Sequence, residues 1–146
     1  FAGLAVALLV SITGAIAALG DTLFPAATVA AGLRDEFGSS AHMLQRLRVL
    51  HPVAAITGAV VVAFAALGAV RHSALARRIA LFVLALLFAQ LIAGAVNIIL
   101  LAPVWMQLLH LFLADLLWIA LVVLTLQVAD ASAGFRPAPD TRLPKY

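Results

Sequence analysis

The sequence predicts an all-α integral membrane protein, a four-helix bundle, on three observations. Hydrophobic residues make up 66% of the 146 residues and charged residues only 10%, far from the composition of soluble proteins. The mean hydropathy is +1.19. Apolar segments long enough to cross a bilayer, which takes about 20 residues as a helix, recur four times. The length suits one compact unit rather than two domains.

The four expected spans cover residues 1–19, 49–70, 79–101 and 105–129 and form one unit, residues 1–129. An outer loop covers 20–48, and an irregular tail with three prolines covers 130–146. The run from Ile79 to Ala114 has no Asp, Glu, Lys or Arg and is too long for one crossing, so we divide it at Pro103, which interrupts a helix. Because the chain begins at Phe1 within an apolar run, we expect it to be a piece of a longer protein.

Basic residues predict the orientation. They flank the second and third spans and occur in the tail: Arg71, Arg77, Arg78, Arg136, Arg142 and Lys145. By the positive-inside rule, the N-terminus, the C-terminus and the loop between spans two and three are cytoplasmic. The outer loop is then on the opposite side. These residues lie in loops rather than on one face, so the net charge of +3 does not indicate nucleic acid binding.

The outer loop contains a short amphipathic pattern. Its apolar residues recur at helical spacing: Met43, Leu44, Leu47 and Leu50. The pattern predicts a helix on the membrane surface that leads into the second span, with Ser39 or Ser40 as its cap. Pro52 biases His51 away from helical geometry, and either begins the second span or kinks it.

Two histidines lie in otherwise apolar segments, His51 and His110. With the expected topology both fall in the outer leaflet, at depths that differ by several ångströms at a rise of about 1.5 Å per residue. An imidazole is costly in lipid and usually has a partner. Two imidazoles at similar depth predict a shared one, and bis-histidine ligation holds a haem between bundle helices. The alternative is an ordinary hydrogen bond between helices.

Residues around the histidines fit a porphyrin. Gly58 is seven residues after His51 and Ala114 is four after His110, which leaves room on the same helix faces. Gln90, Gly94 and Asn97 form one polar and small face on the third span. The same residue types also join membrane helices in bundles without a cofactor, so both interpretations remain open.

Charged residues near the histidines each have more than one interpretation. Arg46 and Arg48 precede His51 at the membrane boundary, where forked arginine hydrogen bonds suit haem propionates. Both arginines are equally typical of a helix that lies at the membrane interface without a cofactor. Asp115, five residues past His110, is costly in lipid if charged; a protonated state, a pairing with another helix and a proton-relay role all remain open. The sequence has no cysteine, which excludes disulfides, zinc thiolates and iron–sulfur sites.

In their order and spacing, these residues resemble haem A synthase, and specifically its C-terminal half. The similarity covers most of Ala2 to Val128. It consists of Thr13-Gly14-Ala15 through Gly20-Asp21-Thr22-Leu23-Phe24-Pro25, His51-Pro52 with Gly58, Gln90, Gly94 and Asn97 followed by Pro103, and His110-Leu111 with Ala114 and Trp118.

The resemblance implies half of an eight-helix, pseudo-symmetric protein in which each four-helix half offers two histidines to a haem. That enzyme oxidises a methyl group of haem O to the formyl group of haem A, which cytochrome oxidase needs. Its C-terminal half holds a haem b that transfers electrons. By this resemblance His51 and His110 are the axial iron ligands, in a multi-pass protein of the plasma (inner) membrane of a prokaryote.

The sequence departs from the family's substrate half. A glutamate precedes the first haem histidine there by three residues, whereas Arg48 and Gln107 occupy the corresponding positions here. The glutamate of this chain, Glu36, lies in the outer loop. We therefore expect no catalytic residue in this chain and no activity from it alone. Expected partners are the N-terminal half of the same enzyme or a second copy, haem O synthase or cytochrome oxidase, and membrane lipid.

Two alternatives from other classes remain. One is a haem-free structural membrane subunit of a respiratory complex, whose histidines would tolerate glutamine. The other is a small membrane cytochrome b, which often carries two haems on four intramembrane histidines. Only His51 and His110 lie within the expected spans, which makes the cytochrome b the weaker alternative.

Overall fold

A computed structural model describes residues 1–133, which contain helices and no strand. The elements are α1 (Ala2–Leu23), α2 (Val29–Phe37), α3 (Met43–Arg48), α4 (Leu50–Ala69), α5 (Ala74–Ile99) and α6 (Val104–Ala133). Four helical segments are long and apolar enough to cross a membrane: α1, the stretch from Met43 to Ala69, α5, and α6 as far as Ala131. The fold class predicted from the sequence is confirmed.

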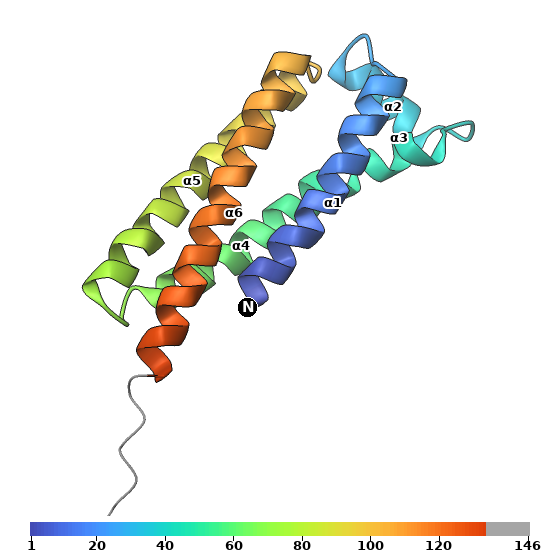
Figure 1. Ribbon diagram of the computed structural model, residues 1–146. Coiled ribbons are helices and arrows are strands. Elements are labelled where there is room, and N and C mark those ends of the chain that lie inside the picture. Colours follow the sequence, from blue (N-terminus) through green and yellow to red (C-terminus); the bar gives the residue numbers. More distant parts are fainter. Residues whose placement is uncertain (134–146) are drawn as a thin grey trace, which may run out of the picture.

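The four long helices form two antiparallel pairs (Figure 1). α1 packs along α4, and α5 packs along α6, while α4 also contacts α5 and so joins the pairs. The short helices α2 and α3 lie together at the end of the bundle where α1 stops and α4 begins. The chain therefore passes along the bundle four times, and the short helices α2 and α3 lie at one end.

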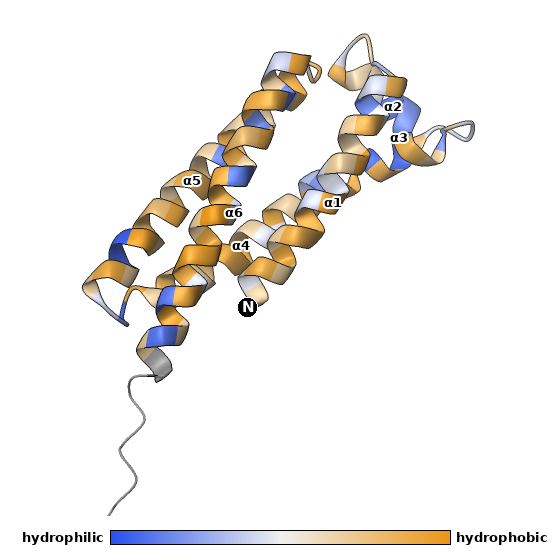
Figure 2. Ribbon diagram, in the orientation of Figure 1, coloured by the Kyte–Doolittle hydropathy of each residue, from blue (hydrophilic) through white to orange (hydrophobic). Residues whose placement is uncertain are grey.

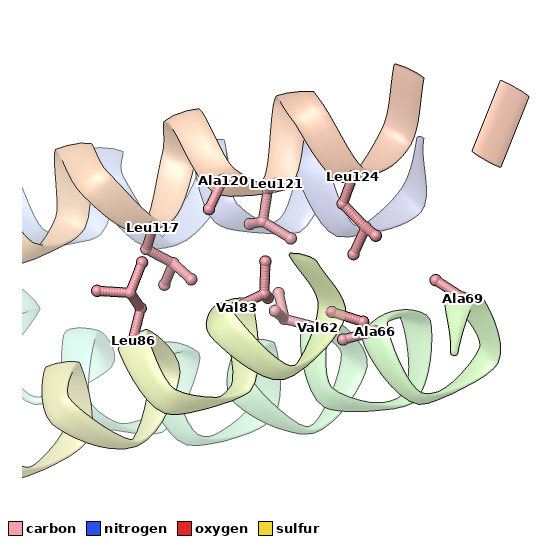
Figure 3. Packing of buried hydrophobic residues seen from close by; sticks show 10 residues of the cluster. Val62, Ala66, Ala69, Val83, Leu86, Leu117, Ala120, Leu121 and Leu124 are labelled. Atoms are coloured by element: carbon pink, nitrogen blue, oxygen red, sulfur yellow. The ribbon is translucent and has the colours of Figure 1, made fainter. Parts of the chain in front are cut away.

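The main hydrophobic core lies in the half of the bundle around the α4–α5 loop (Figure 3). It draws small and branched residues from three helices: Val62, Ala66 and Ala69 of α4, Ala80, Val83 and Leu86 of α5, and Leu117, Ala120, Leu121 and Leu124 of α6. Alanines here let the helix backbones approach closely, as is usual between membrane helices. The two pairs are thus tied together at the end of the bundle opposite α2 and α3.

The outward faces of the long helices are apolar (Figure 2). Large side chains such as Phe64, Phe88 and Ile99 are mostly exposed, which in water would be an unusually extensive apolar surface. In a bilayer these apolar side chains contact lipid tails and need no cover from protein. The helix backbone is also compatible with lipid, because its polar groups are bonded within the helix. The chain is an integral membrane protein.

Three helix ends differ from the expected boundaries by four residues or more. α1 continues to Leu23 instead of Leu19. α5 begins at Ala74, five residues before Ile79, because the Ser73 hydroxyl accepts a hydrogen bond from the Ala76 amide and caps the helix. α6 continues past residue 129 to Ala133, so the expected irregular tail starts later. Residues 134–146 of that tail lie outside the described residues.

The outer loop is more helical than the sequence suggested. α2 was not predicted; Thr28 caps it by accepting from the Ala31 amide. α3 matches the predicted amphipathic helix, but its cap is His42, which with Gln45 forms a reciprocal capping box. The prediction of a Ser39 or Ser40 cap was wrong, because the imidazole nitrogen serves as the acceptor that a serine oxygen usually provides.

His51 is helical, contrary to the bias expected from Pro52. α4 begins at Leu50, so Pro52 is its third residue. In the first turn of a helix the amide that proline lacks has no intrahelical acceptor, and proline is tolerated there. Neither a start of the span at Pro52 nor a kink is needed, and the first turn of α4 carries His51 directly into the bundle.

The turn between α5 and α6 occupies the expected break. Leu101 and Ala102 both have positive φ, 60° and 52°, and Pro103 immediately precedes α6. The Gln107 side chain donates to the Ala102 carbonyl at 2.6 Å. This bond ties the first turn of α6 to the strained turn, and so helps set where His110 lies along the helix.

Candidate functional site

The structure brings the two histidines of the bundle together. His51, in the first turn of α4, and His110, in the second turn of α6, have ring centroids 6.4 Å apart and ring planes at 82°. Both side chains are half-buried. The helices that carry them belong to different pairs, so this contact bridges the two halves of the bundle at the end away from the main core.

Each imidazole lies against a glycine of the neighbouring helix in its own pair. A Cβ at Gly14 of α1 would lie 3.0 Å from Cε1 of His51, and one at Gly94 of α5 would lie 3.2 Å from Cε1 of His110. Any larger residue at either position would displace the ring. The two helix pairs therefore present their histidines in the same way, ring edge over glycine.

Each imidazole also has one polar neighbour on that same helix. The Thr13 hydroxyl oxygen is 3.1 Å from Nδ1 of His51, and the Gln90 amide nitrogen is 3.2 Å from Nε2 of His110. Gln90 was expected at the site from the sequence; Thr13 was not. The signal that would have found it is the pair Thr13-Gly14, a polar residue beside a glycine within an apolar span.

Several buried polar atoms of the α5–α6 pair have no hydrogen-bond partner: Gln90 Oε1, Asn97 Oδ1 and His110 Nδ1. Buried groups of this kind are normally bonded, and exceptions often mark functional sites or the place of a bound group. The amide oxygen of Asn97 is thus enclosed and unsatisfied, on the α5 face that the sequence analysis singled out.

The centroid separation of the imidazoles is that of an edge-to-face ring pair, and it also equals the separation expected for two imidazoles bound to one metal ion. A metal–nitrogen bond of about 2.0 Å, with the ring nitrogen about 1.2 Å from the ring centre, puts the two centroids about 6.4 Å apart. The observed separation is 6.4 Å. Among residues 1–133 no three His, Cys, Asp or Glu side chains gather into a metal-binding group; a haem needs only two axial ligands from the protein, because the porphyrin supplies the others.

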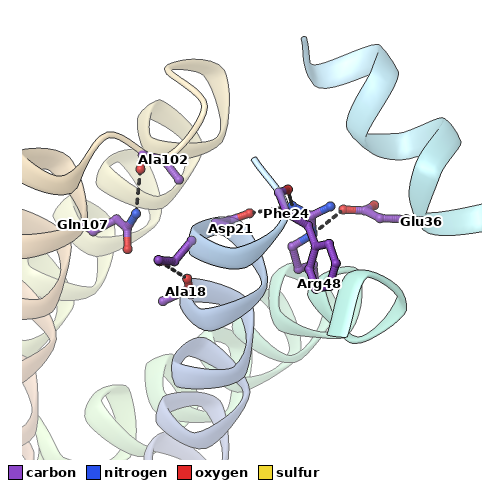
Figure 4. A network of polar contacts seen from close by, with 8 residues as sticks. Ala18, Asp21, Phe24, Glu36, Arg48, Ala102 and Gln107 are labelled. Atoms are coloured by element: carbon purple, nitrogen blue, oxygen red, sulfur yellow. Dashed lines mark hydrogen bonds and ion pairs between the residues drawn. The ribbon is translucent and has the colours of Figure 1, made fainter. Parts of the chain in front are cut away.

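Arg48 lies at the centre of a polar network (Figure 4). Its side chain is 7% exposed and forms ion pairs with Asp21 at 3.0 Å and Glu36 at 3.2 Å. It also donates to the Phe24 carbonyl at 3.1 Å, and Gly20 leaves room for its stem. These contacts join the ends of α1, α2 and α3. They give Arg48 a structural role, and propionate binding by Arg48 stays a prediction.

The remaining residues predicted for the cofactor have different surroundings. Arg46 is exposed and donates to the carbonyls of Gly38 and Ser39. Gly58 is buried, and a Cβ there would lie 2.7 Å from a methyl group of Val10 of α1, which gives Gly58 a part in packing α4 on α1. Ala114 is half-buried one turn after His110. Contacts of these residues with a cofactor stay predictions.

Comparison with protein families matches the chain to the COX15-CtaA family, described as cytochrome oxidase assembly protein, over residues 1–122. The chain belongs to this family. Its members are related to haem A synthase, an oxidoreductase of haem A biosynthesis, so the family resemblance read from the sequence is confirmed. The description of the COX15-CtaA family places its members in cytochrome oxidase assembly.

Two curated relatives carry a different name. Proteins called protoheme IX farnesyltransferase, from two strains of Thermus thermophilus, are each 42% identical to this COX15-CtaA chain over 135 residues. The match covers 91% of this chain but 22% of each relative, so the chain spans about a fifth of their length. No solved structure matches.

Proposed function

We propose that this chain is the haem b-binding, electron-transferring four-helix half of a haem A synthase. The observation that carries the proposal is the pair of imidazoles from α4 and α6, 6.4 Å apart between centroids, each over a glycine. His51 and His110 are the proposed axial ligands. A bound haem would supply one-electron redox chemistry.

The protein's own contribution is binding. His51 and His110 would hold the haem, and a haem held by two imidazoles would supply electron transfer rather than reaction with small ligands. Arg48 lies three residues before His51, and its guanidinium forms ion pairs with Asp21 and Glu36. The oxidation of the haem O methyl group is therefore proposed to take place elsewhere, in a second four-helix half or a second copy.

The relatives support a set of partners. A region like this chain is part of longer proteins whose name describes farnesyl transfer to protohaem IX. We propose that this chain acts beside a haem O synthase, whose farnesylated product is too apolar to leave the membrane, and upstream of cytochrome oxidase. The proposed location is the plasma (inner) membrane with both termini cytoplasmic, in keeping with the arginines around the α4–α5 loop and the positive-inside rule.

The test is the visible spectrum of the purified chain produced with haem available. We expect a low-spin b-type spectrum, oxidised and dithionite-reduced, with about one haem per chain. His51→Ala and His110→Ala should each abolish the low-spin form. His72→Ala, at an exposed histidine of the α4–α5 loop, is the matched control and should leave it unchanged.

Two results would overturn the proposal. A full bis-imidazole spectrum in both variants would exclude His51 and His110 as the ligands. A chain that folds but takes up no haem would favour the haem-free structural subunit, and replacement of both histidines by glutamine should then leave its stability unchanged.

A further inference from the structure

The two histidines differ in the side chain that contacts a nitrogen of the imidazole ring. His51 faces the hydroxyl of Thr13 on α1, and His110 faces the amide of Gln90 on α5. A hydroxyl has one proton and an amide group has a donor end and an acceptor end. Counting protons therefore shows whether each partner fixes the tautomer of its imidazole, which decides the nitrogen that carries a free lone pair.

At His51 the two contacts of the Thr13 hydroxyl favour one placement of its proton, because the contact with the Val10 carbonyl is the shorter. Thr13 Oγ1 lies 2.8 Å from the Val10 carbonyl oxygen, and a carbonyl oxygen only accepts. The single hydroxyl proton is therefore donated to Val10, and the oxygen is left as an acceptor for His51 Nδ1 at 3.1 Å. With the Thr13 oxygen as acceptor, His51 carries its proton on Nδ1, which leaves the lone pair on Nε2.

At His110 the partner occupies the nitrogen itself. The Gln90 amide nitrogen meets Nε2 at 3.2 Å, so the amide donates to the lone pair that a metal would need. Rotation of the amide by half a turn would instead require a proton on Nε2. In either arrangement His110 Nδ1 remains buried without a partner, and Nε2 is engaged by Gln90 and is not free to bind a metal until that amide moves.

We infer that Thr13 is a positioning residue that presets His51 as the Nδ1–H tautomer, and that His51 is therefore the first of the two histidines to ligate. His110 follows once the Gln90 amide releases its Nε2. The order of ligation rests on the proposed haem site; the tautomer of His51 does not, because it is a property of the protein without cofactor. Hydrogen bonds to the second nitrogen of a ligating histidine orient the ring and raise its basicity.

The tautomer is measured in the haem-free full chain in detergent, by nitrogen–proton correlation spectra of ¹⁵N-labelled histidine. We expect His51 as a single Nδ1–H tautomer, a mixture of tautomers in Thr13→Val, and the single tautomer again in Thr13→Ser, which restores a hydroxyl. Ser11→Ala is the matched control, because Ser11 is an exposed hydroxyl residue of α1 that donates to the Ala7 carbonyl. An Nε2–H tautomer in the unaltered chain, or no change in Thr13→Val, would overturn the inference.

The order of ligation is measured by haem titration of single-histidine variants. His110→Ala should retain a five-coordinate, high-spin haem on His51, and His51→Ala should bind haem more weakly. Thr13→Val should lower haem affinity by about 10–100-fold, with recovery in Thr13→Ser. Equal affinities of the two histidine variants would refute the order. An unaltered chain that binds no haem would instead defeat the proposed function, while the tautomer spectra would still decide the role of Thr13.

Discussion

Replacement of Arg48 by methionine should destabilise the protein strongly. Methionine keeps much of the arginine's length but removes the charge and every donor. The change leaves Asp21 and Glu36, which are 32% and 12% exposed, without their cation, and frees the Phe24 carbonyl. Because Arg48 itself is buried, its pairs are not screened as surface pairs are.

The magnitude follows from these contacts. Removing one partner of a buried ion pair costs about 3–5 kcal/mol. Asp21 is one-third exposed and regains water, so we take the lower end, ~3 kcal/mol. At about 2–4 °C per kcal/mol for a chain of this size, Arg48→Met should lower the melting temperature by roughly 6–12 °C.

The assay is thermal unfolding in detergent, followed by circular dichroism. The matched control is Arg46→Met, two residues away, where the arginine donates to two backbone carbonyls at the surface; we expect a change of at most about 0.5 kcal/mol. Equal melting temperatures for the two variants would refute the structural role of Arg48. Loss of haem binding by Arg48→Met at unchanged stability would favour the propionate interpretation instead.

Two further predictions concern the glycines at the site and the outer loop. Gly14→Ala and Gly94→Ala should each weaken haem binding in a titration, because the new Cβ would lie 3.0 or 3.2 Å from a carbon of the histidine ring. Gly68→Ala is the control and should not weaken it, because nothing lies within 4 Å of a Cβ there. Equal haem affinities in all three variants would contradict a role of Gly14 and Gly94 in seating the imidazoles. Burial raises the pKa of the Glu36 carboxyl, opposed by the Arg48 cation and reinforced by nearby carboxylates. The ionised form is therefore less favourable folded than unfolded. The melting temperature of the unaltered chain should accordingly fall relative to Glu36→Gln as the pH rises above 4.5; a relative rise would contradict this.

Much of the bundle could be predicted from the sequence because lipid imposes simple constraints. Spans are read from the length of apolar runs, and Pro103 marks the reversal between the last two. The proximity of His51 and His110 was predicted from their similar depth, because residues at similar depth on the helices of one small bundle lie close together. These arguments need no knowledge of side-chain contacts, and they yielded the positions that matter for the site.

What the sequence did not predict depends on contacts between distant residues. Arg48 stands at the membrane boundary beside His51, where an arginine suits a propionate, but it turns toward Asp21, 27 residues earlier. The Arg48 guanidinium pairs with two carboxylates, one on α1 and one on α2. Neither is a sequence neighbour of Arg48, so the pairing could not be predicted from spacing along the chain. Ser73 is a simpler omission: a serine before an alanine-rich segment is an ordinary helix cap, hidden here by Arg77 and Arg78.

The position of the core gives the proposed cofactor a structural part as well as a redox one. The helix pairs are packed on each other through Val62, Val83 and Leu121 at one end, while at the other end the link between α4 and α6 is the pair of imidazoles. A group ligated by both would strengthen the link between the pairs at this end. Any ligand that binds only the folded state stabilises it, by about 2.7 kcal/mol at a hundredfold excess over its dissociation constant. Haem loading should therefore protect the histidine end of α4 and α6 from hydrogen exchange more than the core end, which is already closed by its own packing.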